Sequence, residues 1–481
     1  MPAGGYWGRY LRVDVTTGEA VFLPLPEEVL RRYIGGVGLG AWLLLREAPP
    51  GVDPLSPQAP LIFSLSPLVG TPLTTSAKFA VVAKSPLTDR INDALSSSHF
   101  AIAAKRAGFD ALVLVGACRE PSVLVIDQTA VTIEDGRDLW GLSASEAERR
   151  LKERLRARGS GSEAGFHTAA IGPAGENLVR FATLSNDGRH AGRGGLGAVM
   201  GSKRLKALAV RGSRFVPLAD PKTVYRQAKD LSARSLGPAT EKYRELGTVS
   251  NLMLFNRLAV LPTRNFQDNT FEAAASLSPE HLAAMRTKTR SSCAACTIGC
   301  EHVYGVRRET GGGGARDGGA AARGDTAPAR TVRMEYESLF ALGPLCGISD
   351  PDAVLEAAAL CDDLGLDTIS AGGTIAFAME CAARGLIDRE RFPATVPLEF
   401  GNASAVHTLL RLIARREGLG SLLAEGSRRA AAAIGGDAPA FAPHVKGLEI
   451  PGYEPRALQA MALGFAVGTR GADHNRSSAY E

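Results

Sequence analysis

Residues 186–212 read NDGRHAGRGGLGAVMGSKRLKALAVRG and mark the point at which the pattern of the chain changes. Before this segment, short apolar and β-branched runs are separated by glycine and proline; after it, apolar residues recur at helical spacing. Six glycines in its first part leave backbone N–H groups free beside four cationic side chains, which suits a phosphate-bearing ligand. The cations are Arg189, His190, Arg193 and Lys203. The GK[ST] ending of a P-loop is missing, and a plain glycine turn fits equally well.

Seven apolar runs before residue 213 have the length and composition of β-strands. They are RYLRVDV (9–15), PLIFSL (60–65), KFAVVAK (78–84), ALVLVG (111–116), SVLVID (122–127), TAAIG (168–172) and KALAVRG (206–212). Two helices interrupt them, one from about Pro26 to Arg46 and one after Ser143, which can cap it while Glu146 reaches back. Because strands and helices do not alternate regularly, a doubly wound sheet is not predicted.

The segment GGVGLGA (35–41) superficially fits the dinucleotide-binding fingerprint. That fingerprint needs a strand before it, whereas the preceding residues EEVLRRYI read as a helix. A close-packed turn is therefore the preferred interpretation.

The rest of the chain is mostly helical. Helices are predicted at 221–235, after Ser278, between the cap Asp350 and Gly365, and at about 370–384, 404–416 and 420–434. The segment between Glu309 and Arg330 has almost no large apolar side chain, so we predict a disordered surface insert there. These patterns together predict an α+β protein, β-rich at 1–212 and mostly α-helical from 213.

Composition excludes several classes of protein. A chain of 481 residues exceeds one core and predicts two to four domains. The net charge of +5, from 55 basic and 50 acidic residues spread along the chain, predicts neither a nucleic-acid nor a membrane partner. Seven mostly unclustered cysteines and the absence of a signal sequence or long apolar run predict a cytoplasmic protein.

The segment CAACTIGC places Cys293, Cys296 and Cys300 within eight residues. Soft thiolates separated by small residues can converge on zinc or on an iron–sulfur cluster. His302 could complete a zinc site, whereas a cluster would need a fourth cysteine from elsewhere. The spacing favours a cluster over zinc.

Several segments, in order along the whole chain, resemble the tungsten-containing aldehyde:ferredoxin oxidoreductases. They are RYIGGVGLGA near the start, KSPLT (84–88), IGPAGENLVRFA (171–182), GRGGLGAVMGSKRLKALAV (192–210), CAACTIGC, EYESLFALG (335–343), CDDLGLDTIS (361–370) and LAEGS (423–427). The resemblance implies an N-terminal β-rich saddle that binds tungsten, or molybdenum, held by two molybdopterins, with helical domains covering it. It divides the chain into 1–212, 213–445 and the start of a C-terminal helical domain at 446–481.

The resemblance also assigns cofactor contacts. Cys293, Cys296 and Cys300 would ligate a [4Fe-4S] cluster. Backbone carbonyls at Leu95 and Ala191 would hold a Mg²⁺ that bridges the two pterin phosphates, Lys78 would be a basic phosphate contact, and Gly192, Arg193, Gly194 and Gly195 would face pterin and phosphate. Asp362, Gly365, Leu366 and Asp367 match the pterin-binding D-x-x-G-L-D motif; aspartates at a helix end can accept from a pterin ring, or can simply be solvated.

The candidate catalytic residues are Glu337 and His474. Glu337 in EYES matches the family's active-site glutamate, a general base toward water or a hydrated aldehyde, and an extended segment would put Glu335 on the same face. His474 in RGADHNRSS matches a histidine near the metal that suits proton transfer, and Arg476 could meet a phosphate.

Glu356 and His407 match ligands of an iron that lies between two subunits in some members. The E-x-x-H pairs of the family are broken here, because Ala359 and Ser404 occupy the other halves. A homodimer is therefore one hypothesis, with Glu356 and His407 as ligands of a bridging iron, and an ordinary solvated carboxylate is the alternative for Glu356.

Two departures from the family stand out. The chain stops at SSAYE, before the region that would carry a fourth cluster cysteine and a second pterin motif, so we expect a fragment. Cys346 lies where an apolar residue is usual; it could ligate tungsten, as in the catalytic subunit of ATP-independent benzoyl-CoA reductases, although a buried inert thiol is the preferred interpretation.

Three functions follow as hypotheses. The first is oxidation of an aldehyde to its acid, with electrons leaving through the cluster to ferredoxin. The second is a benzoyl-CoA reductase-like tungsten enzyme, and the third is a zinc-stabilised structural or interaction protein without redox chemistry.

Overall fold

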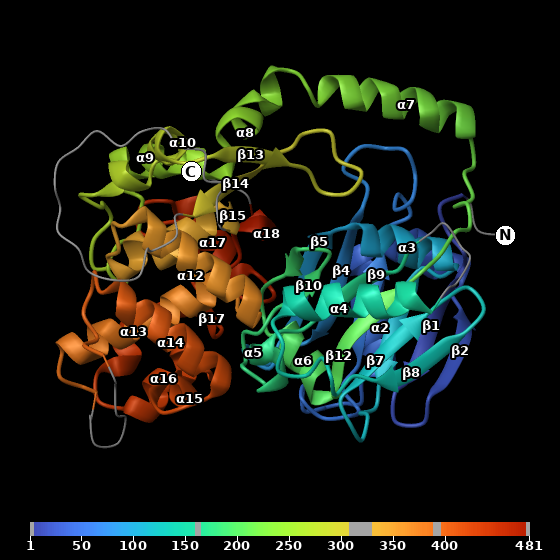
Figure 1. The fold of residues 1–481 in the computed structure, drawn as a ribbon, viewed down its shortest axis with the longest axis horizontal. Helices are drawn as coiled ribbons and strands as arrows, with labels where there is room; N and C mark the ends of the chain where they lie inside the picture. The colour runs from blue at the N-terminus through green and yellow to red at the C-terminus, as the bar shows by residue number, and fades with distance from the viewer. Residues whose placement is uncertain (1–3, 159–164, 307–329, 388–395, 478–481) are drawn as a thin grey trace.

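The chain folds into a β-rich N-terminal region and a mostly helical region that lie side by side (Figure 1). The structure, a computed structural model, describes residues 4–158, 165–306, 330–387 and 396–477. This arrangement confirms the predicted α+β class. The insert predicted at 309–330 falls outside the described residues except for Arg330.

Two six-stranded sheets build the N-terminal region. Their strand orders are β2-β1-β6-β3-β4-β5 and β11-β10-β9-β12-β7-β8. The strands are β1 Arg9–Asp14, β2 Glu19–Pro24, β3 Leu61–Leu65, β4 Lys78–Lys84, β5 Ile91–Ser97, β6 Ala111–Val115, β7 Ser122–Ile126, β8 Val131–Asp135, β9 His167–Ala170, β10 Leu184–Asn186, β11 Arg189–Ala191 and β12 Leu205–Val210. All seven predicted runs are strands. The five others were not predicted: β2 contains an apolar run but is half exposed, and the other four are short or carry polar residues.

Helices separate and cover the sheets in layers. Alternate residues of the first sheet, such as Tyr10 and Val82, pack against α1 (Glu27–Tyr33) and α2 (Gly36–Glu47). Their neighbours, such as Leu11 and Val81, share a core with α3 (His99–Ala107), α6 (Leu196–Ser202) and the second sheet, whose other face packs on α4 (Ala144–Ala157). Central strands are buried on both faces, which explains why they read as continuous apolar runs.

The helix predicted over 26–46 is wrong as a single element. It breaks at Ile34, whose φ is 61°, and at Gly35, and then resumes as α2. The segment at 35–41 is therefore a turn only at its start and is otherwise the first part of α2. A β-carbon at Gly40 would overlap the side chain of Val82, so glycine lets α2 lie directly on the sheet. A helix precedes these glycines, so they lack the strand that a dinucleotide site needs.

Ser143 caps α4 as predicted, because its hydroxyl accepts from the Glu146 N–H. The Glu146 carboxylate does not reach back, and forms ion pairs with Arg149 and Arg150 instead.

The helical region has one large core, formed by residues from Val249 to Ala472 together with a few from the N-terminal region, such as Leu87 and Phe181. Its helices are α5 Pro173–Glu176 at the boundary, α7 Pro221–Arg234, α8 Glu241–Leu246, α9 Asn251–Arg257, α10 Pro279–Met285, α11 Tyr336–Leu342, α12 Pro351–Leu364, α13 Thr368–Ala383, α14 Ala403–Arg415, α15 Leu419–Leu423, α16 Ser427–Ile434, α17 Gln459–Val467 and α18 His474–Ser477. The predicted helices are found, but that of 420–434 is two helices. Gly426, with φ of 84°, separates them where a β-carbon would overlap Leu87.

Two small sheets were not predicted. One consists of β13 Lys288–Ser291, β14 Glu301–Val306 and β15 Arg330–Met334, and the other of β16 His444–Val445 and β17 Leu448–Glu449. The loop between β13 and β14 carries the three clustered cysteines. Within the described ranges, no helix is both long enough and apolar enough to cross a membrane.

Candidate active site between the two regions

Glu337 and His474 face each other from α11 and α18. The distance from Glu337 Oε1 to His474 Nδ1 is 3.5 Å, and each side chain is 15% exposed. Glu337 Oε2 accepts from the Gly452 N–H at 3.0 Å. Neither Oε1 nor Nδ1 has a conventional hydrogen-bond partner among the described residues. The pair therefore presents one buried carboxylate oxygen and one buried ring nitrogen to each other.

Burial raises the pKa of Glu337 above its ordinary value, and the neighbouring His474 opposes that shift. Asp367 adds to the rise because it places a second negative charge nearby. A carboxyl group whose pKa is shifted upward is suited to exchange protons close to neutral pH.

The extended arrangement expected for EYES is wrong. Glu335 is extended, but as the residue that precedes α11, and the helix begins at Tyr336. The Glu335 carboxylate accepts instead from the Thr248 hydroxyl at 3.1 Å. The two glutamates therefore have different surroundings, and only Glu337 faces His474.

Arg193 joins the glycine-rich segment to the helical region. Its guanidinium donates to the carbonyls of Ala472 at 2.6 Å and Glu449 at 2.7 Å, and lies 3.3 Å from Asp367 Oδ2. Asp367 also caps α13, accepting from the Ile369 N–H and the Ser370 hydroxyl. Both residues were predicted to contact the cofactor; in the structure, their polar atoms hold the two regions together beside Glu337.

The D-x-x-G-L-D motif forms the end of α12. Gly365 ends the helix with φ of 75°, and its carbonyl accepts from the Thr183 N–H at 2.8 Å. Leu366 forms a bridge with Ala182 of the N-terminal region. The backbone of the motif thus docks on the first region, while the Asp362 side chain stays 37% exposed.

A cavity of about 590 Å³ lies beside Asp362, between α4 and β10 on one side and α12 and β15 on the other. His190 Nε2 is 3.3 Å from Asp362 Oδ1, and burial lowers the pKa of His190. The charged groups lining this cavity include residues that the sequence analysis missed, namely Glu148, Arg149, Lys152, Asp187, Arg333 and Asp363. Nothing in their local sequence distinguishes them from surface charges, because the cavity forms only when the two regions meet.

The glycines at 192–201 have two different roles. β-Carbons at Gly194 and Gly195 would overlap Asn92 and the Arg180 carbonyl, and both residues have φ above 80°. Gly197 and Gly201 likewise lie directly against backbone of the N-terminal region. Gly192 has open space where a β-carbon would be. Most of these glycines therefore allow close packing against neighbouring backbone and side chains. Gly192 is the position at which a ligand could approach the backbone closely.

We expect Gly195→Ala to destabilise the fold and Gly192→Ala to leave stability unchanged. The first variant places a β-carbon on the Arg180 carbonyl at a left-handed residue, so a loss of about 1–3 kcal/mol is expected. The second fills only open space, and should lower pterin content instead. Thermal unfolding and pterin release from both variants check this. Equal melting temperatures for the two would contradict it.

The other predicted cofactor contacts lie along β4, β5 and β11. Ala191 is fully buried, Leu95 is 43% exposed, and the exposed Lys78 lies opposite Ser97 in the β4–β5 ladder. Arg476 forms ion pairs with Asp93 and Asp473. Asp473 also pairs with Arg470. Burial tends to raise the pKa of Asp473, but the charges of Arg470 and Arg193 leave it lowered overall. These pairs fix the loop that ends in His474.

The three clustered cysteines lie on one half-buried loop. The Arg189 guanidinium contacts Cys293 Sγ and forms an ion pair with Glu301, with an N–O distance of 2.6 Å. Within the described ranges, no group of three or more His, Cys, Asp or Glu side chains is arranged to hold a metal ion. His302 does not join the thiols, because its Nε2 lies 3.1 Å from the Arg244 carbonyl. The loop supplies three thiols of the right chemistry, without a converged arrangement.

Comparison with known proteins decides the family. Residues 10–212 match the family described as aldehyde ferredoxin oxidoreductase, N-terminal domain, and residues 226–481 match its domains 2 and 3. The chain is 40% identical over 476 residues to the tungsten-containing aldehyde ferredoxin oxidoreductases of Pyrococcus furiosus and Thermococcus kodakarensis, covering 98% of this chain and 74% of each relative. The chain belongs to the aldehyde ferredoxin oxidoreductase family.

More distant members of the comparison act on other substrates. The chain is 30% identical to the aliphatic sulfonate oxidoreductase, WOR-like subunit, of Pyrococcus furiosus, covering 98% of this chain and 76% of that protein. A solved active-site complex of benzoyl-coenzyme A reductase with 1,5-dienoyl-CoA has a TM-score of 0.80 and 26% identity, covering 97% of this chain and 70% of that chain. The fold of the aldehyde ferredoxin oxidoreductase family is therefore shared with enzymes of different specificity.

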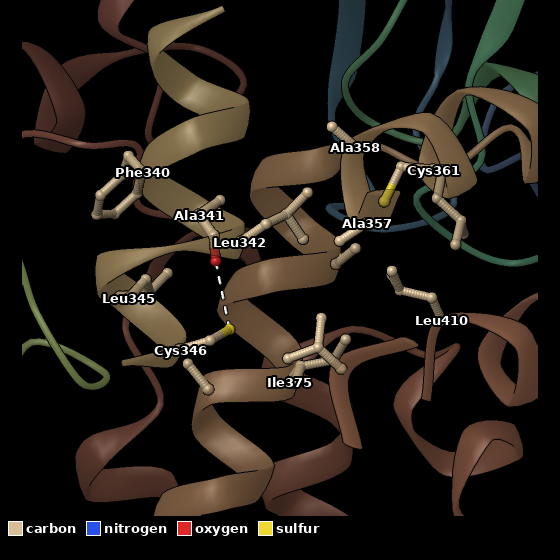
Figure 2. Packing of buried hydrophobic residues seen from close by; sticks show 14 of the residues in the cluster. Phe340, Ala341, Leu342, Leu345, Cys346, Ala357, Ala358, Cys361, Ile375 and Leu410 are labelled. Atoms are coloured by element: carbon tan, nitrogen blue, oxygen red, sulfur yellow. Dashed lines mark hydrogen bonds between the residues drawn. The ribbon is translucent and has the colours of Figure 1, made fainter. Parts of the chain in front are cut away.

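Cys346 is a core residue in this family member (Figure 2). It is fully buried, and its thiol donates to the Ala341 carbonyl, with an S–O distance of 3.3 Å. Burial raises its pKa to about 12, so the thiol stays protonated. The structure supports the buried inert thiol over a tungsten ligand.

The two candidate ligands for an iron between subunits lie on neighbouring helices, Glu356 on α12 and His407 on α14. The His407 Nε2 lies 2.9 Å from the Ala353 carbonyl, so this nitrogen already has a partner. Neither residue belongs to a metal-binding group among the described side chains. The structure gives no support to an iron here.

Proposed function

We propose that this chain oxidises an aldehyde to the corresponding carboxylic acid and passes the electrons to ferredoxin. The observation that carries the proposal is the buried Glu337–His474 pair, whose facing atoms have no hydrogen-bond partner among the residues that the structure describes. The relatives named as tungsten-containing aldehyde ferredoxin oxidoreductases support the same activity. In the overall reaction, an aldehyde and water give a carboxylic acid, two protons and two electrons.

The residues present fit the family's cofactor. Gly192 has open space beside its backbone, and within the described part of the chain Glu337 and His474 each keep a polar atom without a hydrogen-bond partner. When bound, a tungsten ion held by two molybdopterins supplies a Lewis acid and a two-electron acceptor. Gly192, Ala191, Leu95, Lys78 and Asp362 are the proposed contacts of the pterins, their phosphates and a bridging Mg²⁺.

Side chains of the protein would carry out the proton transfers. The Glu337 carboxylate accepts a proton from the water that adds to the aldehyde carbonyl, and Oε1 passes it across 3.5 Å to His474 Nδ1. The Gly452 N–H holds the other carboxylate oxygen, so Glu337 keeps its orientation while it changes charge. Asp473, held by Arg470 and Arg476, keeps the His474 loop in place.

The electron path and the assembly are proposed from the same family. Cys293, Cys296 and Cys300 would supply three ligands of a [4Fe-4S] cluster, and Arg189 would stabilise the Cys293 thiolate. A homodimer remains a proposal. The zinc-stabilised alternative lacks support, because His302 is turned to Arg244 and the chain belongs to a redox family.

The benzoyl-CoA reductase-like alternative rests on the structural neighbour. In the sequence, the feature that favoured this alternative was Cys346 as a tungsten ligand. In the structure, the Cys346 thiol lies inside the core and donates to a backbone carbonyl. Aldehyde oxidation is therefore the function that the site supports best. Metal and pterin analysis of the purified protein, together with aldehyde-dependent reduction of a viologen dye, tests it. One zinc, no pterin and no dye reduction would overturn it.

We expect kcat/KM to fall on the acid side with an apparent pKa above the ordinary glutamate value of about 4.3. The base must be ionised to act, and burial raises the pKa of Glu337, so lowering the pH protonates it earlier than a solvated glutamate. A pH–rate profile with the dye as acceptor measures this. A flat profile down to the ordinary glutamate range would argue against Glu337 as the base.

A further inference from the structure

Positive charge is concentrated around the cysteine loop. Residues 222–246 carry six basic and three acidic side chains, and residues 286–300 carry three basic side chains and no acidic one. These two segments alone hold more net positive charge than the whole chain, whose net charge is +5. The remainder of the protein is therefore slightly acidic, and the basic character is local.

The two segments meet at the loop. The Ser235 hydroxyl at the end of α7 contacts the Thr297 hydroxyl, and Thr297 also contacts Thr74 at 2.8 Å. The Arg290 side chain of β13 lies against Gly299 in the same loop. In Figure 1, α7 runs along the edge of the molecule above the β13–β14 connection. The cysteine loop is thus framed by α7 and β13.

This surface is open. Along α7 only Ala228 is buried, and Tyr225 and Leu231 are 62% and 42% exposed. Arg226 and Lys229 are exposed on the same helix, and Ala295 and Thr297 are exposed in the loop itself. A helix that contributes one buried residue to its own core, yet presents aromatic, aliphatic and cationic side chains outward, has the composition of a protein interface.

We propose that the surface formed by α7, β13 and the cysteine loop is the docking site of the protein that accepts the electrons, a small acidic iron–sulfur carrier. This proposal rests on the proposed function. Electrons that reach the cysteine loop can leave at the exposed Thr297 edge, and the cationic side chains of α7 and β13 steer an acidic partner into contact. Tyr225 and Leu231 supply apolar contact beside the cations.

The test compares two double variants. Arg226→Glu/Lys229→Glu reverses the charge of α7 without touching the core or the cysteines, and Arg411→Glu/Arg415→Glu makes the same change on the exposed face of α14. We expect the first to raise the KM for an acidic [4Fe-4S] ferredoxin about tenfold, equivalent to about 1.4 kcal/mol, and to weaken its salt dependence. Reduction of a viologen dye should be unchanged in both, and the control should keep its ferredoxin KM.

The outcomes separate this proposal from the proposed function. Unchanged ferredoxin kinetics in the α7 variant, with dye activity intact, overturns the docking site and leaves the activity standing. If the unaltered protein reduces neither acceptor, the proposed function fails, and calorimetric titration of ferredoxin into both variants decides the docking site. Weaker binding to the α7 variant alone supports it, and equal binding overturns it.

Discussion

Replacing Glu337 by glutamine should lower kcat by about 10²- to 10⁴-fold while the protein stays folded. Glutamine is nearly isosteric, and its side-chain oxygen can still accept from the Gly452 N–H. It cannot take a proton from water at neutral pH, so the chemical step loses its base. Steady-state dye reduction at saturating aldehyde measures the effect.

The same substitution should not lower the stability of the fold, although it lowers kcat. Burial raises the pKa of Glu337, which means that the ionised carboxylate is disfavoured in the fold, so Glu337→Gln should keep or raise the melting temperature. Glu280→Gln, on the exposed start of α10, is the matched control. It should change neither kcat nor the melting temperature. A Glu337→Gln protein with near-normal kcat would remove Glu337 from the mechanism.

The local sequence was sufficient wherever short-range physics decides the structure. Continuous apolar runs predicted the central strands, and Asp350 and Gly365 predicted both ends of α12. The break at Ile34 was missed because it depends on contact with the first sheet, where Gly35 lies against the backbone of Leu65. The small sheet around the cysteines was missed because its first strand is polar and exposed.

The site was predictable in part. The family resemblance predicted Glu337 and His474 as catalytic residues, and in the structure their side chains lie next to each other. Residue spacing could not show that Arg193 forms an ion pair with Asp367 and donates to the carbonyls of Ala472 and Glu449. These partners lie far away in sequence. The same holds for Glu148, a buried acid that accepts from Thr168, Ser185 and the Asp187 N–H.

Lys105→Met should destabilise the protein by about 3–5 kcal/mol, the largest stability effect we expect. Lys105 on α3 and Asp110 just before β6 form an ion pair of 2.5 Å with 0% and 1% of their side chains exposed. The other Asp110 oxygen accepts from the Trp7 and Gly8 N–H groups, so the pair fastens the start of the chain to α3 and β6. Methionine fills the space but leaves a buried carboxylate without a countercharge. Urea unfolding followed by circular dichroism measures the change.

Two further variants show whether the loss comes from the uncompensated charge. Lys105→Met/Asp110→Asn removes both charges and should recover part of the stability, because no buried ion remains. Arg31→Met breaks the Arg31–Glu27 pair, whose side chains are 72% and 51% exposed, and should leave the unfolding midpoint unchanged. If Lys105→Met behaved like Arg31→Met, the buried pair would not be what fixes the N-terminal strand against α3. If the double variant were no more stable than Lys105→Met, lost packing rather than the stranded Asp110 charge would account for the effect.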